Sequence, residues 1–338
     1  MADGLVISDV SYSGTFASYF WIPATFGLDT VQKGIVYVQD GIKKKHTIGR
    51  VDFSQPLQSR QATPTSSGSW TIDGRTLEPH DLMLYTEFNP RDFEAHWLAE
   101  QLSPTLLARE LPVTAENYML QIALNRMFEQ IETSIWMGST TYTATPGTAG
   151  NGQLVWFDGF LKKMVNDSAV QKVASPYTLT AAASDGSHTN IVDALNSLLT
   201  LAATNKKALL SKANRYERLK FIVSINTEQI YQTYITTSLT YKGVNTTDRG
   251  TNTFKGYEIV PVAGMPDDTI IFCEATPGTD SNLYIGMNST EDNNLQLMRL
   301  QNNSELFFIK GLMKYDVQYA FSEQVFLFTT LTSGTFTA

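Results

Sequence analysis

The chain has 338 residues with a formal net charge of −8, and 17% of its residues are charged, below the ~25% that is usual for soluble domains. The acidic balance argues against a basic nucleic-acid reader, because tight phosphate binding requires many cations. The single cysteine, Cys273, excludes a disulfide framework within the chain, and no apolar run approaches the ~20 residues of a transmembrane helix. We therefore expect a soluble protein, made in a reducing cytosol, whose low charge suits burial against copies of itself.

The first quarter of the chain predicts extended structure. Residues 1 to about 33 alternate weakly and carry several glycines, which is typical of an arm rather than a compact element. Residues 34–88 read as one long two-stranded excursion with a polar tip at 54–70, and Asp40-Gly41 is a hairpin signal near its start. Because a bare two-stranded ribbon is marginally stable in water, we expect this excursion to lie against a neighbouring subunit.

The middle of the chain predicts helices. A short helix is expected from Asn89, and the clearest helix is expected at about 115–137, with Thr114 as its cap and Gly138 at its end. Apolar residues recur at helical spacing along this second helix, and we expect them to be core without a functional role: Leu120, Ala123, Leu124, Met127, Phe128, Ile131 and Ile135.

The rest of the chain predicts an α/β unit followed by strands. A helix capped by Thr189 or Asn190, a buried strand "RLKFIVSIN", a short helix and two further strands fill the stretch up to about 281. From 282 onward, alternating aromatic segments predict strands almost to the end of the chain. The α/β unit would thus be inserted within a second unit that is made of 89–170 and the closing strands.

This order of parts resembles the major capsid protein of tailed double-stranded DNA phages, the Hong Kong phage fold. The residues that carry the resemblance are "TLEPHDLMLYTEFNPRDFE" before the long helix, "LVWFDGFLKKM" after it, and "VPVAGMPDDTIIF" with "SNLYIGM" before the last strands. The resemblance implies an α+β fold with an N-terminal arm (1–33), an extended two-stranded loop (34–88), a peripheral domain (89–170 and 282–338) with a spine helix at about 115–137, and an inserted axial α/β domain (171–281). The closing strands would form a structural sheet beneath the spine helix, where no chemistry is needed.

The resemblance also implies a function. Copies of the chain would form hexamers and pentamers of an icosahedral shell around packaged DNA, which the shell would confine without specific contacts. The virion capsid would be assembled in the host bacterial cytoplasm. Portal protein is an implied partner, and a decoration protein is a further candidate. Many members carry a charged helical scaffolding segment at the N-terminus, and its absence here implies either a separate scaffolding protein or none. Two alternatives stay open: an encapsulin-like compartment, which would need an inner pocket for cargo peptides, and a cytosolic α/β enzyme with its site in the inserted unit.

No catalytic, cofactor or metal site is predicted. The histidines His46, His80, His96 and His188 are not paired at the three- or four-residue spacing of helical metal ligands. Phosphate-cradling glycine motifs and the GxSxG elbow are absent from the sequence. Acidic residues around the expected helix start, including Glu87, are more often partners of the helix dipole than a catalytic pair.

The basic run at residues 43–45 has three interpretations. It is either a solvated edge that protects an exposed hairpin from aggregation, or a patch that faces acidic residues of a neighbouring subunit, or, third in rank, a DNA contact. Some members of the family join their subunits by a lysine–asparagine isopeptide bond. The position of these lysines is the only feature of the sequence that supports such a cross-link here. The candidate intersubunit contacts are Lys43, Lys44, Lys45, Arg50, Arg60, Arg75, Asp3 and Asp9.

Overall fold

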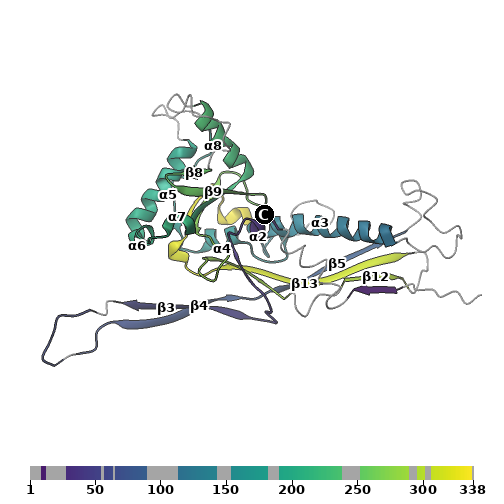
Figure 1. Ribbon diagram of the computed structural model, residues 1–338, viewed down its shortest axis with the longest axis horizontal. Coiled ribbons are helices and arrows are strands. Elements are labelled where there is room, and N and C mark those ends of the chain that lie inside the picture. The colour runs from purple at the N-terminus through teal and green to yellow at the C-terminus, as the bar shows by residue number, and fades with distance from the viewer. Residues whose placement is uncertain are drawn as a thin grey trace, which may run out of the picture.

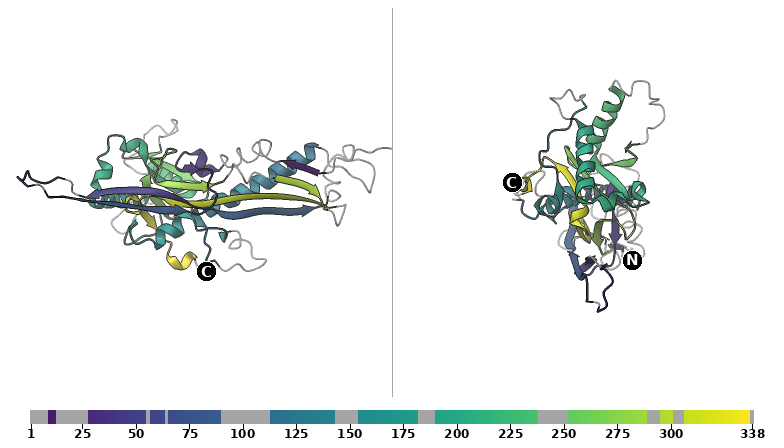
Figure 2. Two further views of the ribbon diagram at one scale, coloured as in Figure 1. Left: turned by 90° about the horizontal axis from the view of Figure 1, so that it is seen from below. Right: turned by 90° about the vertical axis from the view of Figure 1, so that its left-hand side faces the viewer.

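The computed structural model describes residues 9–12, 28–54, 57–63, 65–89, 113–142, 154–181, 190–237, 252–288, 295–300 and 306–336. The molecule is elongated (Figures 1 and 2). A long helix over a sheet lies at one end, a two-stranded ribbon projects at the other, and a unit with several helices rises to one side. This mixture of sheets and helices is the predicted α+β class. The short helix that we expected from Asn89 lies outside the described residues.

A six-stranded sheet lies beneath the long helix (Figure 1). Its order is β1 (Asp9–Tyr12), β12 (Leu295–Arg299), β13 (Phe307–Tyr319), β11 (Leu283–Met287) and β2 (Tyr37–Gln39), and β5 (His80–Phe88) also pairs with β13. The strands β11 and β12 do not pair with each other, because each pairs with β13. Three of the closing strands, β11, β12 and β13, therefore lie in the sheet that we expected below the spine helix.

The long helix α3 (Val113–Met137) confirms the helix predicted at about 115–137, but it begins before Thr114, so the expected cap is wrong. Its side chains Leu124, Met127, Ile131 and Ile135 are buried, and they share one hydrophobic core with the inner face of β13. Phe128, which the apolar stripe places in the core, is only half-buried and packs at the margin of this core. The helix ends before Gly138, and α4 (Phe160–Asn166) follows.

A second six-stranded sheet belongs to the α/β unit. Its order is β6 (Gln171–Lys172), β14 (Phe326–Thr329), β10 (Thr269–Glu274), β7 (Leu219–Ser224), β9 (Tyr257–Val262) and β8 (Thr253–Phe254). The strand β14 comes from the closing part of the chain, so the residues after 282 contribute strands to both sheets.

Helices complete the α/β unit: α5 (Ile191–Asn205), α6 (Lys207–Leu210), α7 (Arg215–Arg218) and α8 (Ile225–Thr237). Asn190, one of the two expected caps, caps α5, because its side chain accepts hydrogen bonds from the backbone N–H groups of Val192 and Asp193. One face of the sheet packs with α5 and α8, through Phe221 and Phe272 among others. The opposite face, with Ile222 and Ile271, belongs to the same core as α3, so the two units share one hydrophobic core.

The projecting ribbon consists of β3 (His46–Ser54) and β4 (Ser69–Leu77), and we call it the hairpin. The hairpin is shorter than the predicted excursion of residues 34–88, because β2 and β5 belong to the large sheet. The Asp40-Gly41 turn is also not a hairpin turn: β2 runs parallel to β11, and β3 pairs with β4. Gly41, at a φ of 78°, instead lies where the chain leaves the sheet for the hairpin.

Candidate intersubunit surfaces

The base of the hairpin is attached to the body through Arg75. The Arg75 guanidinium lies 4.3 Å from the centre of the Tyr319 ring and pairs with Asp167, just after α4. The Tyr319 hydroxyl donates to the same carboxylate at 2.9 Å. Burial by itself raises the pKa of Asp167, but hydrogen bonds from the Ala169 N–H, Arg75 and Tyr319 outweigh it and hold the pKa below its usual value.

Two residue pairs closer to the tip, Arg50 makes a second attachment. Its guanidinium lies 3.6 Å from the Asp73 carboxylate across the hairpin and 3.5 Å from the Glu323 carboxylate of the body. Glu323 belongs to a 3-10 helix, η5 (Ser322–Gln324), between β13 and β14, and it also pairs with Lys206 at the end of α5. The hydrogen bond from Lys206, aided by Arg50, lowers the pKa of Glu323.

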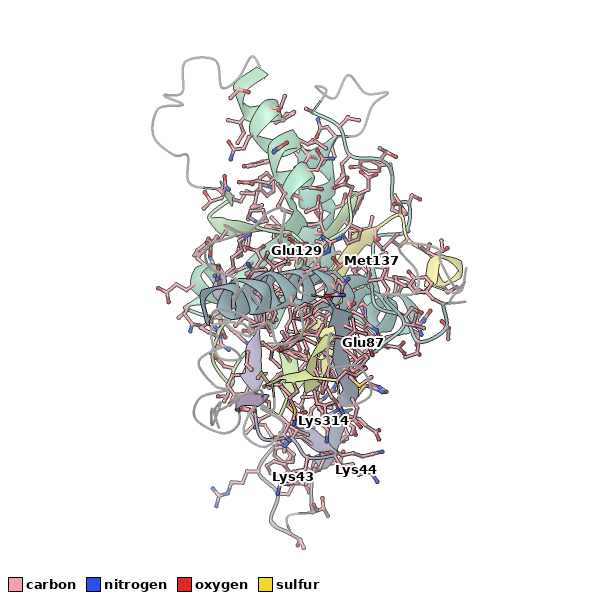
Figure 3. All side chains as sticks on the ribbon, turned by 90° about the vertical axis from the view of Figure 1, so that its right-hand side faces the viewer. Lys43, Lys44, Glu87, Glu129, Met137 and Lys314 are labelled. Atoms are coloured by element: carbon pink, nitrogen blue, oxygen red, sulfur yellow. The ribbon has the colours of Figure 1, made fainter. Side chains whose placement is uncertain are left out.

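The basic run 43–45 lies on the surface next to the hairpin. Lys45 pairs with Glu78 at 2.8 Å, and this hydrogen bond lowers the pKa of the Glu78 carboxyl. Lys43 and Lys44 are exposed, and Figure 3 shows them at the lower end of the view, below Glu87 of β5 and Glu129 of α3. This placement on the surface beside the hairpin is compatible with the first two interpretations of the basic run.

The structure describes only part of the remaining candidates Arg60, Asp9 and Asp3. Arg60 is exposed near the tip of the hairpin. The backbone of Asp9 lies in β1 opposite Met298, but its side chain, and all of Asp3, lie outside the described part of the chain. The basic candidates Lys45, Arg50 and Arg75 thus have acidic partners within their own chain. Their role between subunits stays a prediction. A contact with a neighbouring subunit would have to replace or share these ion pairs within the chain.

An apolar face on the hairpin was missed by the sequence reasoning. Val51 pairs with Ile72, and Phe53 with Trp70, so the four side chains lie on one face of the ribbon. The rings of Phe53 and Trp70 stack at 4.1 Å, yet Trp70 is 67% and Ile72 77% exposed. The signal was present in the sequence, as apolar residues alternate at 51 and 53 and again at 70 and 72.

A second exposed apolar area lies on the large sheet, on the face away from α3. Met83 of β5 pairs with Leu312 of β13, and these side chains are 63% and 42% exposed. Beside them, the ring of Tyr85 lies 5.8 Å from that of Phe308. Exposed apolar areas of this kind mark surfaces that other molecules cover.

The described residues contain no cluster of three or more His, Cys, Asp and Glu side chains that could hold a metal ion. His46 and His80 are exposed, while His96 and His188 lie outside the described ranges. Among the helices that the structure describes, none combines the length and the apolar character that crossing a membrane requires.

No family model matches the sequence, and no curated protein matches it either. Solved structures do match. A chain of the satellite phage P4 procapsid superposes with a TM-score of 0.60 at 10% identity, over 93% of this chain and 90% of that one. A chain from the capsid of Myoviridae phage XM1 gives a TM-score of 0.55 at 13% identity, over 89% and 92% of the two chains. A chain of the cyanophage A-1(L) capsid gives 0.55 at 13% identity, over 90% and 93%. The chain therefore shares the fold of these phage capsid chains, in agreement with the fold that the order of its parts predicts.

Proposed function

We propose that this chain is a major capsid protein, which self-assembles as hexamers and pentamers into an icosahedral shell around packaged double-stranded DNA. The likeness to the P4 procapsid chain supports this proposal because it extends over nine tenths of both chains. The parts of the fold would then act as an N-terminal arm (1–33), an extended loop (34–88), a peripheral domain (89–170 and 282–338) and an axial domain (171–281).

The observation that carries the proposal is the exposed apolar face of the hairpin. Its residues Val51, Phe53, Trp70 and Ile72 lie on a ribbon that projects away from both cores (Figure 2). Burial of such side chains stabilises an association by roughly 25 cal/mol for each Å² that is removed from water. A projecting apolar ribbon is costly in a monomer and useful in an assembly, where a neighbouring copy covers it.

The proposed partners follow from the proposed shell. Copies of the chain are the main partner, and portal, a separate scaffolding protein and a decoration protein complete the particle in the host bacterial cytoplasm. The net charge of −8 fits a shell that confines DNA without binding it tightly, because tight phosphate binding needs many cations. The proposed role is structural and includes no catalysis.

Expression of the full chain, followed by light scattering and negative-stain microscopy, tests the proposal. We expect closed shells from the unmodified chain, and a higher threshold concentration for the double variant Trp70→Thr/Ile72→Thr. The matched control is Thr71→Ser, on the opposite face of the same strand, which should assemble normally. A monomer at every concentration would contradict the proposal. Shells from natural particles that contain cargo protein in place of DNA would favour an encapsulin-like compartment.

A further inference from the structure

Two glycines face each other across the hairpin. Gly49 of β3 and Gly74 of β4 are register partners. Glycine weakens a strand interior because it costs more backbone entropy and offers no side chain to pack. The next pair toward the body is Ile48 with Arg75, and the next pair toward the tip is Arg50 with Asp73. The glycine pair therefore separates two parts of the ribbon that differ in their contacts with the body.

The part on the body side is firmly held. Ile48 and Leu77 are buried in a small cluster with Ile42 and Ala320. Arg75 adds its contacts with Tyr319 and Asp167, and the Gln318 side chain donates to the Thr76 carbonyl at 3.2 Å. Apolar burial and hydrogen bonds thus attach this part to the end of β13 and to the residues that follow α4.

The part on the tip side is held differently. The side chains from Val51 to Ser54 and from Ser69 to Asp73 are exposed wherever the structure describes them. Within the described residues, Arg50 provides two contacts between this part and the body. Its guanidinium pairs with Glu323 at 3.5 Å and lies 5.6 Å from the centre of the Phe321 ring. An ion pair at a partly exposed site is weak, so modest forces are enough to open it.

Glu323 is well placed to control this contact. It lies in η5, where the chain passes from β13 of the large sheet to β14 of the second sheet. Its carboxylate is shared between Arg50 of the hairpin and Lys206 at the end of α5. A shift of the α/β unit relative to the large sheet would therefore be felt at the hairpin through a single carboxylate.

We propose that the Gly49–Gly74 pair is a hinge and that the Arg50–Glu323 ion pair is the latch that holds the outer hairpin, residues 50–73, against the body. When the latch opens, the outer hairpin swings about the glycine pair while the Arg75 attachment stays closed. This device is a property of one chain, so it goes beyond the proposed shell and does not depend on it.

The two glycines offer a way to stiffen the hinge. A Cβ atom built on Gly49 meets no atom within 4 Å, so a side chain fits there without strain. A Cβ atom on Gly74 would lie 2.7 Å from the carbonyl oxygen of Ile48, which rules out this position for a clean test. Threonine at position 49 has a high β-strand propensity, and Gly49→Thr should therefore stiffen the ribbon without changing its register.

The test is a distance measurement by pulsed electron paramagnetic resonance on the full chain, with spin labels at Leu57→Cys near the tip and Ala203→Cys on α5. Both positions are exposed, while the natural Cys273 is fully buried and stays unlabelled. Dilution with unlabelled chain removes distances between copies. We expect one narrow distance distribution for the unmodified sequence, and a distribution at least twice as wide for either Arg50→Ala or Glu323→Ala. Adding Gly49→Thr to Glu323→Ala should make it narrow again.

The matched control is Asp73→Asn, which removes the other carboxylate near Arg50 but leaves the latch in place, and it should keep the distribution narrow. Circular dichroism confirms that each variant is folded. A narrow distribution for both Arg50→Ala and Glu323→Ala would overturn the latch, and a wide distribution that Gly49→Thr does not narrow would overturn the hinge. The distances arise within single chains, so a failure to form shells would count against the proposed function and not against this device.

Discussion

At the scale of single residues, a buried carboxylate joins α3 to the short helix near residue 30. Glu132 of α3 is 5% exposed and accepts hydrogen bonds from the Thr30 backbone N–H, at 3.2 and 3.3 Å to its two oxygens, and from the Thr30 hydroxyl. Thr30 lies in the short helix α2 (Asp29–Gln32), and its hydroxyl accepts a hydrogen bond from the Trp136 indole at 2.9 Å. The Asp29 side chain accepts from the Ala263 N–H after β9. The helix α2 is thus fixed to α3 and to the α/β unit.

This carboxylate should make stability depend on pH. Burial raises the pKa of Glu132, the Thr30 donors only partly offset this, and the negative charge of Asp29 adds to it. A carboxyl whose pKa is raised by folding destabilises the folded chain above that pKa, and the cost disappears as the pH falls toward its unfolded value. The melting temperature of Glu132→Gln minus that of the unmodified chain should therefore increase as pH rises.

The measurement is differential scanning fluorimetry of unassembled chain across a pH series. Glu129→Gln, at an exposed position one turn earlier on α3, is the control for the removal of one carboxylate from the same helix. A difference for Glu132→Gln that stays constant, or that shrinks with rising pH, would contradict the buried-carboxylate argument.

The core positions of α3 allow a second test at this scale. Ile131 is 1% exposed, so Ile131→Ala should lower the free energy of unfolding by about 2–5 kcal/mol. The loss has two parts, because less apolar surface is removed from water on folding and a cavity is left in the core. Phe128 is half-buried at the margin of the core. Phe128→Ala should therefore cost only roughly 1–2 kcal/mol, because less area is lost and solvent fills the gap. Chemical denaturation of the unassembled chain measures both, and equal losses would mean that the margin of the core is misplaced.

At the scale of elements, the features that local signals determine were predictable. The spacing of apolar residues and the Gly138 signal predict α3 to within two residues. The polar residues Thr189 and Asn190 predict the start of α5 to within one residue. The partners of strands were not predictable, because they depend on residues far away in the sequence. Asp40-Gly41 has the composition of a hairpin turn, yet β2 gains more by pairing with β11, where Ile285 and its neighbours are buried.

The same limit applies to the candidate contacts. The sequence shows that Arg50 and Arg75 are basic residues on a strand, but it does not show that Glu323 and Asp167 are their partners, since the fold alone brings these residues together. The apolar face of the hairpin, in contrast, is a local pattern of period two in both strands. The polar tip between the two strands interrupts this pattern, so each strand contributes only two apolar residues to it.

The tip of the hairpin provides a prediction about this element. Replacement of residues 56–68 by a short Gly-Ser turn keeps the Ser54–Ser69 pair and the apolar face. The described residues of this stretch are exposed apart from Ser67, which is half-buried, so the melting temperature of the unassembled chain should stay nearly unchanged. If the tip contacts a neighbouring copy, closed shells should become rare or absent in negative-stain images. Unfolding of the variant would place the tip in its own core, and normal shells would show that the tie lies elsewhere on the hairpin.

At the scale of the whole molecule, the arrangement separates stability from association. One core extends from the large sheet through α3 to one face of the second sheet, and the helices of the α/β unit cover the other face. The hairpin takes part in neither core beyond its small cluster at the base. Changes on the outer hairpin should therefore alter assembly while leaving the subunit folded, which makes this element suitable for adjusting contacts between copies.

The charges beside the hairpin extend this argument to the whole assembly. Lys44 is exposed, and it lies next to Lys45, whose charge is already paired with Glu78. If this surface faces acidic residues of a neighbour, Lys44→Glu should raise the threshold concentration for assembly. Reversing one charge of a solvent-exposed ion pair costs about 1 kcal/mol, and a shell repeats this contact many times. Added salt should reduce the effect, because exposed charges more than about 10 Å apart are screened near 0.1 M.

Lys207→Glu, an equal change of charge at an exposed position on α6, is the matched control. Static light scattering over a concentration series at two salt levels measures both thresholds: a threshold that rises only for Lys44→Glu supports a specific contact, whereas equal rises would assign the effect to net charge.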